Sequence, residues 1–299
     1  MMIPKPLFRW AGAKTKMRSK YGDDFWPTDS FNRFVEPFFG TGAVSFWIYE
    51  RFPETEFFVN DKNDAIIDIY KTIKSDADVF IERVEAWQDQ YLSKSKPDRK
   101  EFYYAERQRH AYDEIETQER SALLFCLLKT SFNGFWQTNQ NTNNKFGTPC
   151  GLLNEKNKIF DKELVKRFER FSQNTKFFSV DFAEMKEHVN DQSFLFLDPP
   201  YRDSHTKYTE DGFSDVDQTR MCEMMNDCHD IGASVSMANK YHFDDFFESN
   251  LNEKFRTITF DVKYTAGRGA VDGEKVAVTE CLIRNYGLEK MNIFDFSTK

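Results

Sequence analysis

The sequence predicts an α/β protein built around a mainly parallel β-sheet, and three observations lead to this fold class. Short apolar runs typical of strands alternate with segments of helical periodicity along the 299 residues. Two of these runs lead into an acid, Asp61 and Asp198, and ligands of open α/β sheets bind at the ends of strands. The last two predicted strands are separated by a turn-rich segment instead of a helix, which predicts an antiparallel strand at the sheet edge.

The N-terminal half alternates strands and helices before it becomes strongly charged. Its predicted elements are a strand at 34–37, a glycine turn, a helix at 43–51, a strand at 56–59 and a helix at 64–74. Residues 75 to about 118 are strongly charged, and Phe80, Val84 and Trp87 have helical spacing there. Residues 119–129 are expected to form a buried helix, and residues 130–158 a polar loop region.

The C-terminal half supplies the remaining elements. Helices are predicted at 162–171 and 221–229, and strands at 177–180, 194–197, 234–237, 257–264 and 276–284. The run Phe194–Leu197 is apolar throughout, which is typical of a buried strand.

The composition is that of a protein with a large packed core, either one large domain or a domain with an insertion. Hydrophobic residues make up 40% of the chain and aromatic residues 16%, which excludes a globally disordered protein. No apolar stretch approaches the ~18 residues of a membrane span, and Met1–Trp10 lacks the apolar core of a secretory signal. We expect a soluble, cytosolic protein with no membrane partner.

Metal-binding patterns are not found in the sequence. The five cysteines form no C-x-x-C pair, and Cys222, Cys228 and His229 do not have the spacing of zinc ligands. We therefore expect buried free thiols and no metal.

The charge distribution predicts a face that binds phosphates, although the net charge is −8. Residues 1–20 carry six Lys or Arg and no acid, and residues 121–154 and 262–271 also lack acids, although 49 of the 299 residues are acidic. Burial alone would explain the apolar residues 122–128 but not the five asparagines between 133 and 144. These acid-free stretches favour a neutral-to-basic face for a nucleic acid.

The motif Asp198-Pro199-Pro200-Tyr201 carries the most specific chemistry. The two prolines stop the preceding strand and stiffen the backbone, so that a carboxylate, carbonyls and an aromatic ring are presented together. A carboxylate and a carbonyl can each accept an N–H bond from the exocyclic amine of a base, which frees the nitrogen lone pair, while the ring stacks on the base. On this motif alone, a strand that ends in a proline turn with an incidental acid stays an open alternative.

A second pattern predicts a nucleoside-bearing cofactor. Residues 34–43 have the pattern of a strand, a turn through Gly40 and Gly42 and the start of a helix, where a ligand can approach the backbone closely. Asp61 follows Gly42 by 19 residues, near the offset at which such folds bind ribose hydroxyls. The third glycine of the dinucleotide fingerprint is missing, which disfavours NAD and leaves room for a mononucleoside cofactor.

In these motifs and their order, the chain resembles the Dam-type, D12-class (alpha-group) adenine-N6 DNA methyltransferases. The matching stretches are 7–14, 34–43, 59–61 and 198–201, with 132–134 and 146–151 similar to the recognition segment and 278–283 to the last strand. The resemblance implies a Rossmann-like class I fold: a seven-stranded, mainly parallel sheet with a reversed terminal strand and a helical target-recognition insertion. It also implies methyl transfer from S-adenosylmethionine to a flipped-out adenine in double-stranded DNA, inside a bacterial or phage-infected cell, as in restriction–modification.

The resemblance assigns roles to individual residues. It implies a catalytic site of Asp198, Pro199 and Tyr201, and cofactor contacts from Trp10, Lys14, Phe38, Gly40, Gly42, Asp61, Asp181, Phe182 and Asp198. DNA contacts are expected from Arg9, Lys129, Phe132, Asn133, Gln137, Asn139, Lys145 and Arg268. The implied domains are a catalytic domain of residues 1–74 and 160–299 and a target-recognition insertion of residues 75–159.

One position departs from the family pattern. Members that methylate GATC usually carry an Arg where this chain has Gln137, and Arg suits guanine whereas Gln suits adenine. We therefore expect a recognition sequence that departs from GATC or is relaxed at its guanine. Alternatively, Arg9, Lys145 or Arg268 supplies the guanine contact.

Two other functions stay open at the level of sequence. An RNA adenine-N6 methyltransferase would share the cofactor turn and the Asp-Pro-Pro-Tyr motif but lack the insertion that recognises a duplex. A catalytically silent DNA-binding module is disfavoured because the acceptor acid Asp198 is present.

Overall fold

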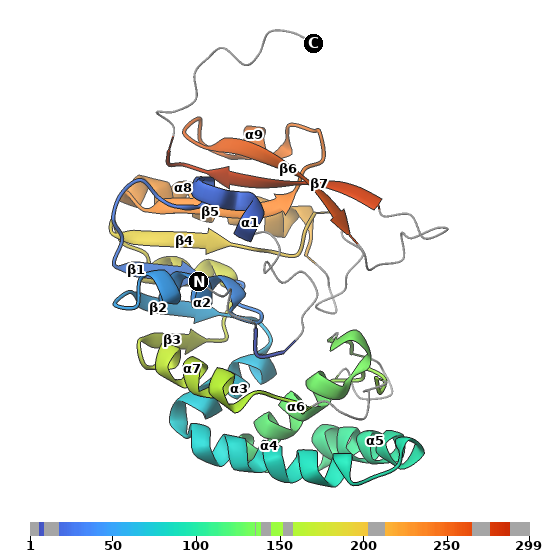
Figure 1. The fold of residues 1–299 in the computed structure, drawn as a ribbon. Helices are drawn as coiled ribbons and strands as arrows, with labels where there is room; N and C mark the ends of the chain where they lie inside the picture. Colours follow the sequence, from blue (N-terminus) through green and yellow to red (C-terminus); the bar gives the residue numbers. More distant parts are fainter. Residues whose placement is uncertain are drawn as a thin grey trace. The chain divides into compact units, whose positions relative to one another are not determined.

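The protein contains a seven-stranded sheet, seen in a computed structural model that describes residues 6–8, 18–134, 136–138, 145–151, 158–202, 213–264 and 276–287. The strand order is β3-β2-β1-β4-β5-β7-β6 (Figure 1). The pairs β2–β3, β1–β4 and β4–β5 are parallel, whereas β7 is antiparallel to both β5 and β6. The predicted fold class, a mainly parallel sheet with a reversed terminal strand, is confirmed.

The chain divides into two compact units. Unit 1 comprises Met1–Lys16 and Phe38–Phe182, and unit 2 comprises Met17–Pro37 and Ala183–Lys299. The expected division into a catalytic domain and a target-recognition insertion concerns function, and it stays a prediction.

Unit 1 packs helices against two parallel strands through aromatic side chains. Its strands are β2 (Glu56–Asn60) and β3 (Thr175–Phe178), and the helices beside them are α2 (Ala43–Arg51), α3 (Asp64–Ser75) and α7 (Lys162–Gln173). The rings of Phe46 and Phe168 stack with centroids 4.3 Å apart, and Phe171 meets Phe57 at 5.0 Å. These buried rings fix α2 and α7 beside β2.

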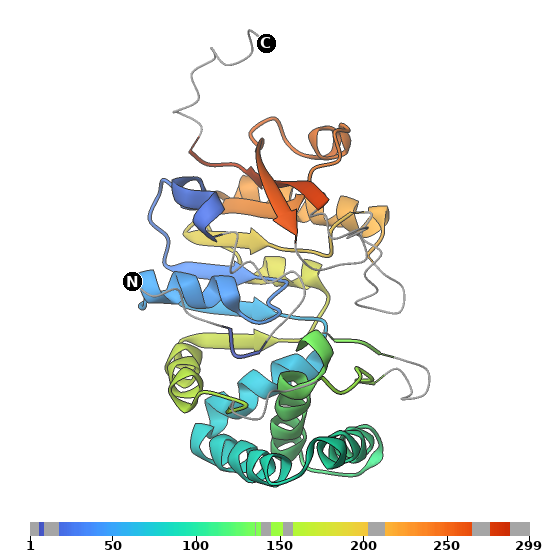
Figure 2. The ribbon, with the colours of Figure 1, turned by 45° about the vertical axis from the view of Figure 1, so that its right-hand side comes forward.

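A second group of helices in unit 1 is centred on α6, against which α4 and α5 pack. The group consists of α4 (Ala77–Leu92), α5 (Lys96–Tyr112) and α6 (Thr117–Thr130), drawn in teal and green in Figures 1 and 2. Every residue of α6 from Ser121 to Leu128 is buried, so the predicted buried helix is confirmed. The outer helices are polar, and their interface includes a hydrogen bond from the Trp87 indole to Glu106 at 3.1 Å. The segment after α6 begins with the short 3-10 helix η3 (Phe132–Gly134).

Unit 2 contains the remaining five strands and their helices. Its strands are β1 (Arg33–Glu36), β4 (Ser193–Leu197), β5 (Ser234–Lys240), β6 (Arg256–Tyr264) and β7 (Val276–Arg284), and its helical elements are α1 (Arg18–Tyr21), η2 (Gly22–Phe25), α8 (Asp215–Ile231) and α9 (Phe246–Asn250). A further 3-10 segment, η5 (Phe182–His188), begins at the last residue of unit 1. All five residues of β4 are buried, as expected for a central parallel strand.

Helix α8 begins six residues before the predicted start at residue 221. Its first turns are polar, so they carry no apolar periodicity, and a capping box between Ser214 and Asp217 fixes the start instead. The extra turns matter because they place Gln218 inside the unit.

The cysteines are free thiols, of which Cys126, Cys222, Cys228 and Cys281 are buried. In the described ranges, no three His, Cys, Asp or Glu side chains cluster as metal ligands would. No helix among the same residues is long and apolar enough to cross a membrane.

Candidate active site

The glycine turn before α2 in unit 1 is tightly built. Phe39 donates its backbone N–H to the Asn60 carbonyl at 2.8 Å, and Gly42 donates to the Phe39 carbonyl at 2.8 Å. Gly40 and Gly42 have φ values of +50° and +65°, a region that favours glycine. A Cβ on Gly42 would lie 2.5 Å from the Phe39 ring, so both the backbone angle and the packing require glycine there.

Asp61 lies directly beside this turn. Its Oδ2 accepts the Gly40 N–H at 2.8 Å, and its Oδ1 accepts the Asn63 N–H at 2.9 Å. Burial raises the pKa of Asp61, although both backbone donors act to lower it. The structure therefore brings the predicted ribose acid and the predicted glycine turn together.

Two aromatic rings lie in the same unit near the ends of β2 and β3. Phe38 and Phe182 stack with centroids 5.4 Å apart and an interplanar angle of 29°. The Asn60 side chain holds the segment before Phe182, because its Oδ1 accepts the Val180 N–H at 2.8 Å and its Nδ2 donates to the Val180 carbonyl at 3.2 Å. Sequence analysis gave Asn60 no role, although a polar residue at the end of an apolar strand was a usable signal.

In unit 2, the motif Asp198-Pro199-Pro200-Tyr201 follows β4 immediately. Asp198 is half-buried and Pro199 is buried. The Pro200 carbonyl accepts a hydrogen bond from Gln218 Nε2 at 3.0 Å, and the Arg202 N–H donates to Asn239 Oδ1 at 3.3 Å. The Pro200 carbonyl is thus engaged by the protein, which favours the Pro199 carbonyl for a ligand.

Tyr201 belongs to a buried acidic and phenolic cluster that sequence analysis missed. Burial raises the pKa of the Tyr201 hydroxyl well above its usual value, and the nearby Asp198, Glu280 and Tyr21 raise it further. Glu280, a fully buried residue of β7, lies near this hydroxyl and is one of the charges that act on it. Glu280 faces Lys240 and Phe260 in the strand register, so long-range strand pairing brings it to this site.

The predicted DNA-contacting residues of unit 1 differ in their surroundings. Phe132 is 56% exposed and the Gln137 side chain is exposed, while the Gln137 backbone is tied to Thr148 Oγ1 and Gly147. Lys129 and Lys145 instead donate to the backbone carbonyls of Leu7 and Ala111, at 3.1 and 2.6 Å.

Several predicted residues have no described side chain. Asn133 is described only as part of η3, and Arg9, Trp10, Lys14, Asn139 and Arg268 lie outside the described residues.

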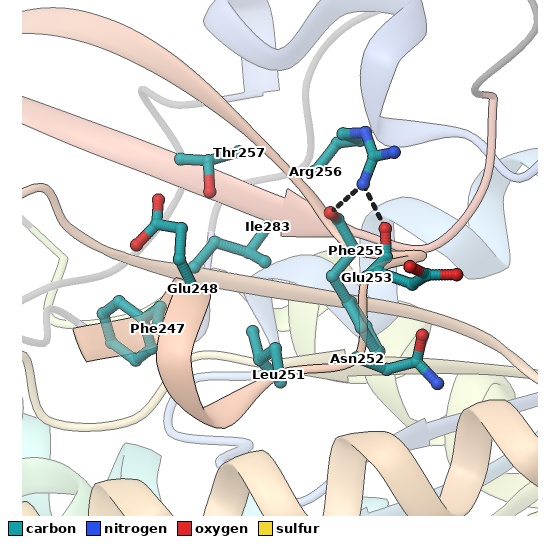
Figure 3. Close-up of a pocket in the computed structure, with 9 residues that line it drawn as sticks. All are labelled: Phe247, Glu248, Leu251, Asn252, Glu253, Phe255, Arg256, Thr257 and Ile283. Carbon is teal, nitrogen blue, oxygen red and sulfur yellow. Dashed lines mark hydrogen bonds between the residues drawn. The ribbon is translucent and has the colours of Figure 1, made fainter. Parts of the chain in front are cut away.

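A pocket of about 270 Å³ lies elsewhere in unit 2, around α9 and the start of β6 (Figure 3). It is lined by Phe247, Glu248, Leu251, Asn252, Glu253, Phe255, Arg256, Thr257 and Ile283. Arg256 bonds the carbonyls of Glu253 and Phe255 at its edge. None of the predicted site residues lines this pocket.

Comparison with models of protein families matches residues 10–266 to the D12 class N6 adenine-specific DNA methyltransferases. The chain belongs to this family. It is therefore an adenine-specific DNA methyltransferase, and such an enzyme requires a methyl donor and a DNA substrate.

Individual relatives cover nearly the whole D12-class chain. It is 31% identical to the type II methyltransferase M.MjaIII of Methanocaldococcus jannaschii, over 95% of this chain and 100% of the relative. It is 28% identical to the type II methyltransferase M1.LlaDCHI of Lactococcus lactis, over 95% of this chain and 96% of the relative. It is 26% identical to the retron Ec67 DNA adenine methylase of Escherichia coli, over 92% of this chain and 90% of the relative.

The unit 1 residues fit the nucleoside methyl donor that a D12-class enzyme is expected to use. The two glycines keep side chains away from the turn, and the Asp61 carboxylate has further lone pairs for hydroxyl groups beyond its two backbone bonds. Phe38 and Phe182 have flat apolar rings of the kind that could pack on a purine.

Substituting Gly42 with alanine tests this turn. We expect Gly42→Ala to weaken binding of S-adenosylhomocysteine about tenfold, because the strained turn must shift away from Phe39. Isothermal titration calorimetry measures the affinity. The control is Gly22→Ala. Gly22 also has a positive φ, of +52°, but no atom lies within 4 Å of the added Cβ. Equal affinity in Gly42→Ala and the parent enzyme would contradict the close approach inferred here.

Proposed function

We propose that this DNA adenine-N6 methyltransferase transfers a methyl group from S-adenosylmethionine to an adenine flipped out of double-stranded DNA. The observation that carries the proposal is the rigid presentation of Asp198 and Tyr201 at the end of the buried strand β4. The catalytic groups are Asp198, Pro199 and Tyr201.

Asp198 and Pro199 act on the target amine. The N6 lone pair of adenine is delocalised into the ring and is a weak nucleophile. The Asp198 carboxylate and the Pro199 carbonyl each accept one N6–H bond, which orients the amine and releases its lone pair for attack. The Tyr201 ring stacks on the base, while the buried Glu280 lies near its hydroxyl.

The methyl donor is bound by residues of unit 1. When bound, S-adenosylmethionine supplies a sulfonium methyl group that is already activated for transfer. Asp61, which already accepts the Gly40 N–H, would accept hydrogen bonds from the ribose hydroxyls. The backbone at Gly40 and Gly42 would hold the methionine portion, and Phe38, Asp181 and Phe182 would hold the adenine ring. Trp10 and Lys14 are proposed to complete the cofactor contacts, with Lys14 on the carboxylate, and Asp198 is proposed as a further donor contact.

Double-stranded DNA is the proposed partner. A paired adenine in such DNA must leave the base stack before its amine can react. The exposed Phe132 and Gln137 are proposed to contact base edges, and Arg9, Asn133, Asn139 and Arg268 to contact bases or phosphates. Lys129 and Lys145 add positive charge beside backbone carbonyls that they already bond. We place the enzyme in the cytoplasm of a bacterial or phage-infected cell, where such DNA is found.

A direct assay separates this function from an RNA adenine methyltransferase. The purified protein is incubated with S-adenosylmethionine and either duplex DNA or RNA of the same sequences, and N6-methyladenine is measured by mass spectrometry. Methylation of DNA alone supports the proposal. Methylation of RNA in preference to DNA would contradict it, and methylation of neither would favour the silent binding module.

Gln137→Arg tests the proposed reader of bases. We expect the parent enzyme to methylate a site that departs from GATC or is relaxed at its guanine, because Gln suits adenine better than guanine. The substitution should shift preference towards GATC by about 1–3 kcal/mol, the usual value of one bidentate base contact. Sequencing that detects N6-methyladenine maps the sites of both proteins. Strict GATC methylation by both would refute the role of Gln137 and leave the methyltransferase assignment intact.

A further inference from the structure

Two buried amide side chains in unit 2 bond to the backbone on both sides of Tyr201. Gln218 lies on α8 and Asn239 on β5, and both are fully buried. Gln218 Nε2 donates to the Pro200 carbonyl at 3.0 Å, and Asn239 Oδ1 accepts the Arg202 N–H at 3.3 Å. The two amides are joined by a bond from Asn239 Nδ2 to Gln218 Oε1 at 3.2 Å. A continuous chain of three hydrogen bonds therefore spans the residue between Pro200 and Arg202.

The orientation of both amides follows from their backbone partners. The Pro200 carbonyl can only accept, so the Gln218 amide must present its nitrogen there. The Arg202 N–H can only donate, so Asn239 must present its oxygen. The remaining Gln218 oxygen and Asn239 nitrogen then match each other, and Asn239 Oδ1 also accepts the Lys240 N–H at 2.8 Å. Neither amide can flip without leaving buried polar groups in conflict.

Further contacts fix the C-terminal side of this segment. The Arg202 guanidinium bonds Asp215 and Asp244 and lies over the Phe246 ring at 4.2 Å, and His242 Nε2 lies 3.0 Å from the Arg202 carbonyl. On the N-terminal side, Asp198 continues from the buried strand β4. The amide pair thus fixes the backbone in the middle of a segment whose two ends are also held by the protein.

We propose that Gln218 and Asn239 are positioning residues for methyl transfer, because they set the backbone that carries the Pro199 carbonyl and the Tyr201 ring. This inference rests on the proposed catalytic role of Asp198, Pro199 and Tyr201. The amides touch neither substrate nor donor. They act through the peptide groups around Tyr201, and a displacement of about 1 Å at a reacting group can cost about 10²-fold in rate.

Gln218→Met tests the proposal with little change in side-chain size. The variant keeps the apolar packing of Gln218 but loses the bonds to Pro200 and Asn239. We expect kcat on duplex DNA to fall about tenfold to a hundredfold. The KM for S-adenosylmethionine and the affinity for S-adenosylhomocysteine should stay within twofold of the parent values. Fluorescence of 2-aminopurine at the target adenine should change, since it reports stacking on Tyr201.

Asn285→Leu is the matched control. Asn285 also bonds backbone groups with its amide, donating to the Ala233 carbonyl at 2.9 Å and accepting the Val235 N–H at 2.7 Å, but at the opposite end of β5. We expect Asn285→Leu to lower the Tm while kcat and the 2-aminopurine signal stay near parent values. Asn239→Leu, which removes the other amide of the pair, repeats the test if the Met variant does not fold. A folded Asn239→Leu variant that keeps the parent kcat would overturn the proposal equally.

The outcomes separate this inference from the function on which it rests. An inactive parent enzyme would overturn the proposed function, and the parent assay alone reveals that result. With an active parent, a Gln218 variant that folds and keeps the parent kcat would overturn the positioning role. If Asn285→Leu lost kcat in the same proportion to its loss of Tm as the Gln218 variant, the positioning role would be overturned as well.

Discussion

Asp198→Ala is expected to lower methylation of duplex DNA by about a thousandfold, the loss typical when a group that stabilises the reacting centre is removed. In the proposed mechanism the carboxylate accepts an N–H of the target amine, so its removal takes away the group that orients the amine and frees its lone pair. Binding of S-adenosylhomocysteine should fall only a few-fold, because we propose that the main donor contacts come from unit 1. Turnover is measured by incorporation of a labelled methyl group, and binding by calorimetry.

The control for this prediction is Asp230→Ala, which removes an exposed acid near the end of α8 in the same unit. Its turnover should match that of the parent. Asp198→Asn tests the charge, since the amide keeps an acceptor oxygen but not the carboxylate, and it should be nearly as inactive as Asp198→Ala. Near-normal turnover of Asp198→Ala would show that the catalytic assignment is wrong.

Asp61→Ala is expected to weaken the binding of S-adenosylhomocysteine by about tenfold to a hundredfold. The estimate follows from the loss of charge-assisted hydrogen bonds to a ribose, worth about 1.5–3 kcal/mol. The variant also leaves the Gly40 and Asn63 N–H groups without their carboxylate partner, which loosens the glycine turn. DNA binding, measured by fluorescence anisotropy, should change little. We expect Trp10→Ala to weaken the binding of S-adenosylhomocysteine in the same way.

Asp64→Ala provides the comparison for Asp61, because Asp64 is an exposed acid three residues further along, in the first turn of α3. Its affinity for S-adenosylhomocysteine should equal that of the parent. Unchanged affinity in both Asp61→Ala and Trp10→Ala would remove the basis for the cofactor site.

Local patterns predicted most of the fold because they report burial and chain stiffness. The apolar run of β4 and the prolines after it predicted where a buried strand ends, and the structure has β4 at Ser193–Leu197. The glycine pattern predicted a tight turn, and Gly42 has a φ of +65°, a region that favours glycine. The start of α8 was missed because polar turns with a capping box have no apolar periodicity.

The sequence alone determined the fold class, the family and the acids proposed for chemistry, since each of these is encoded in residues that are near neighbours along the chain. Only the tertiary structure decided which polar groups meet. Gln218, Asn239 and Glu280 carry no local signal of function, yet helix packing and strand pairing bring them to Pro200, Arg202 and Tyr201. The physical reason is that a buried amide must find a partner within about 3 Å, and the partner is selected by the folded backbone instead of by sequence distance.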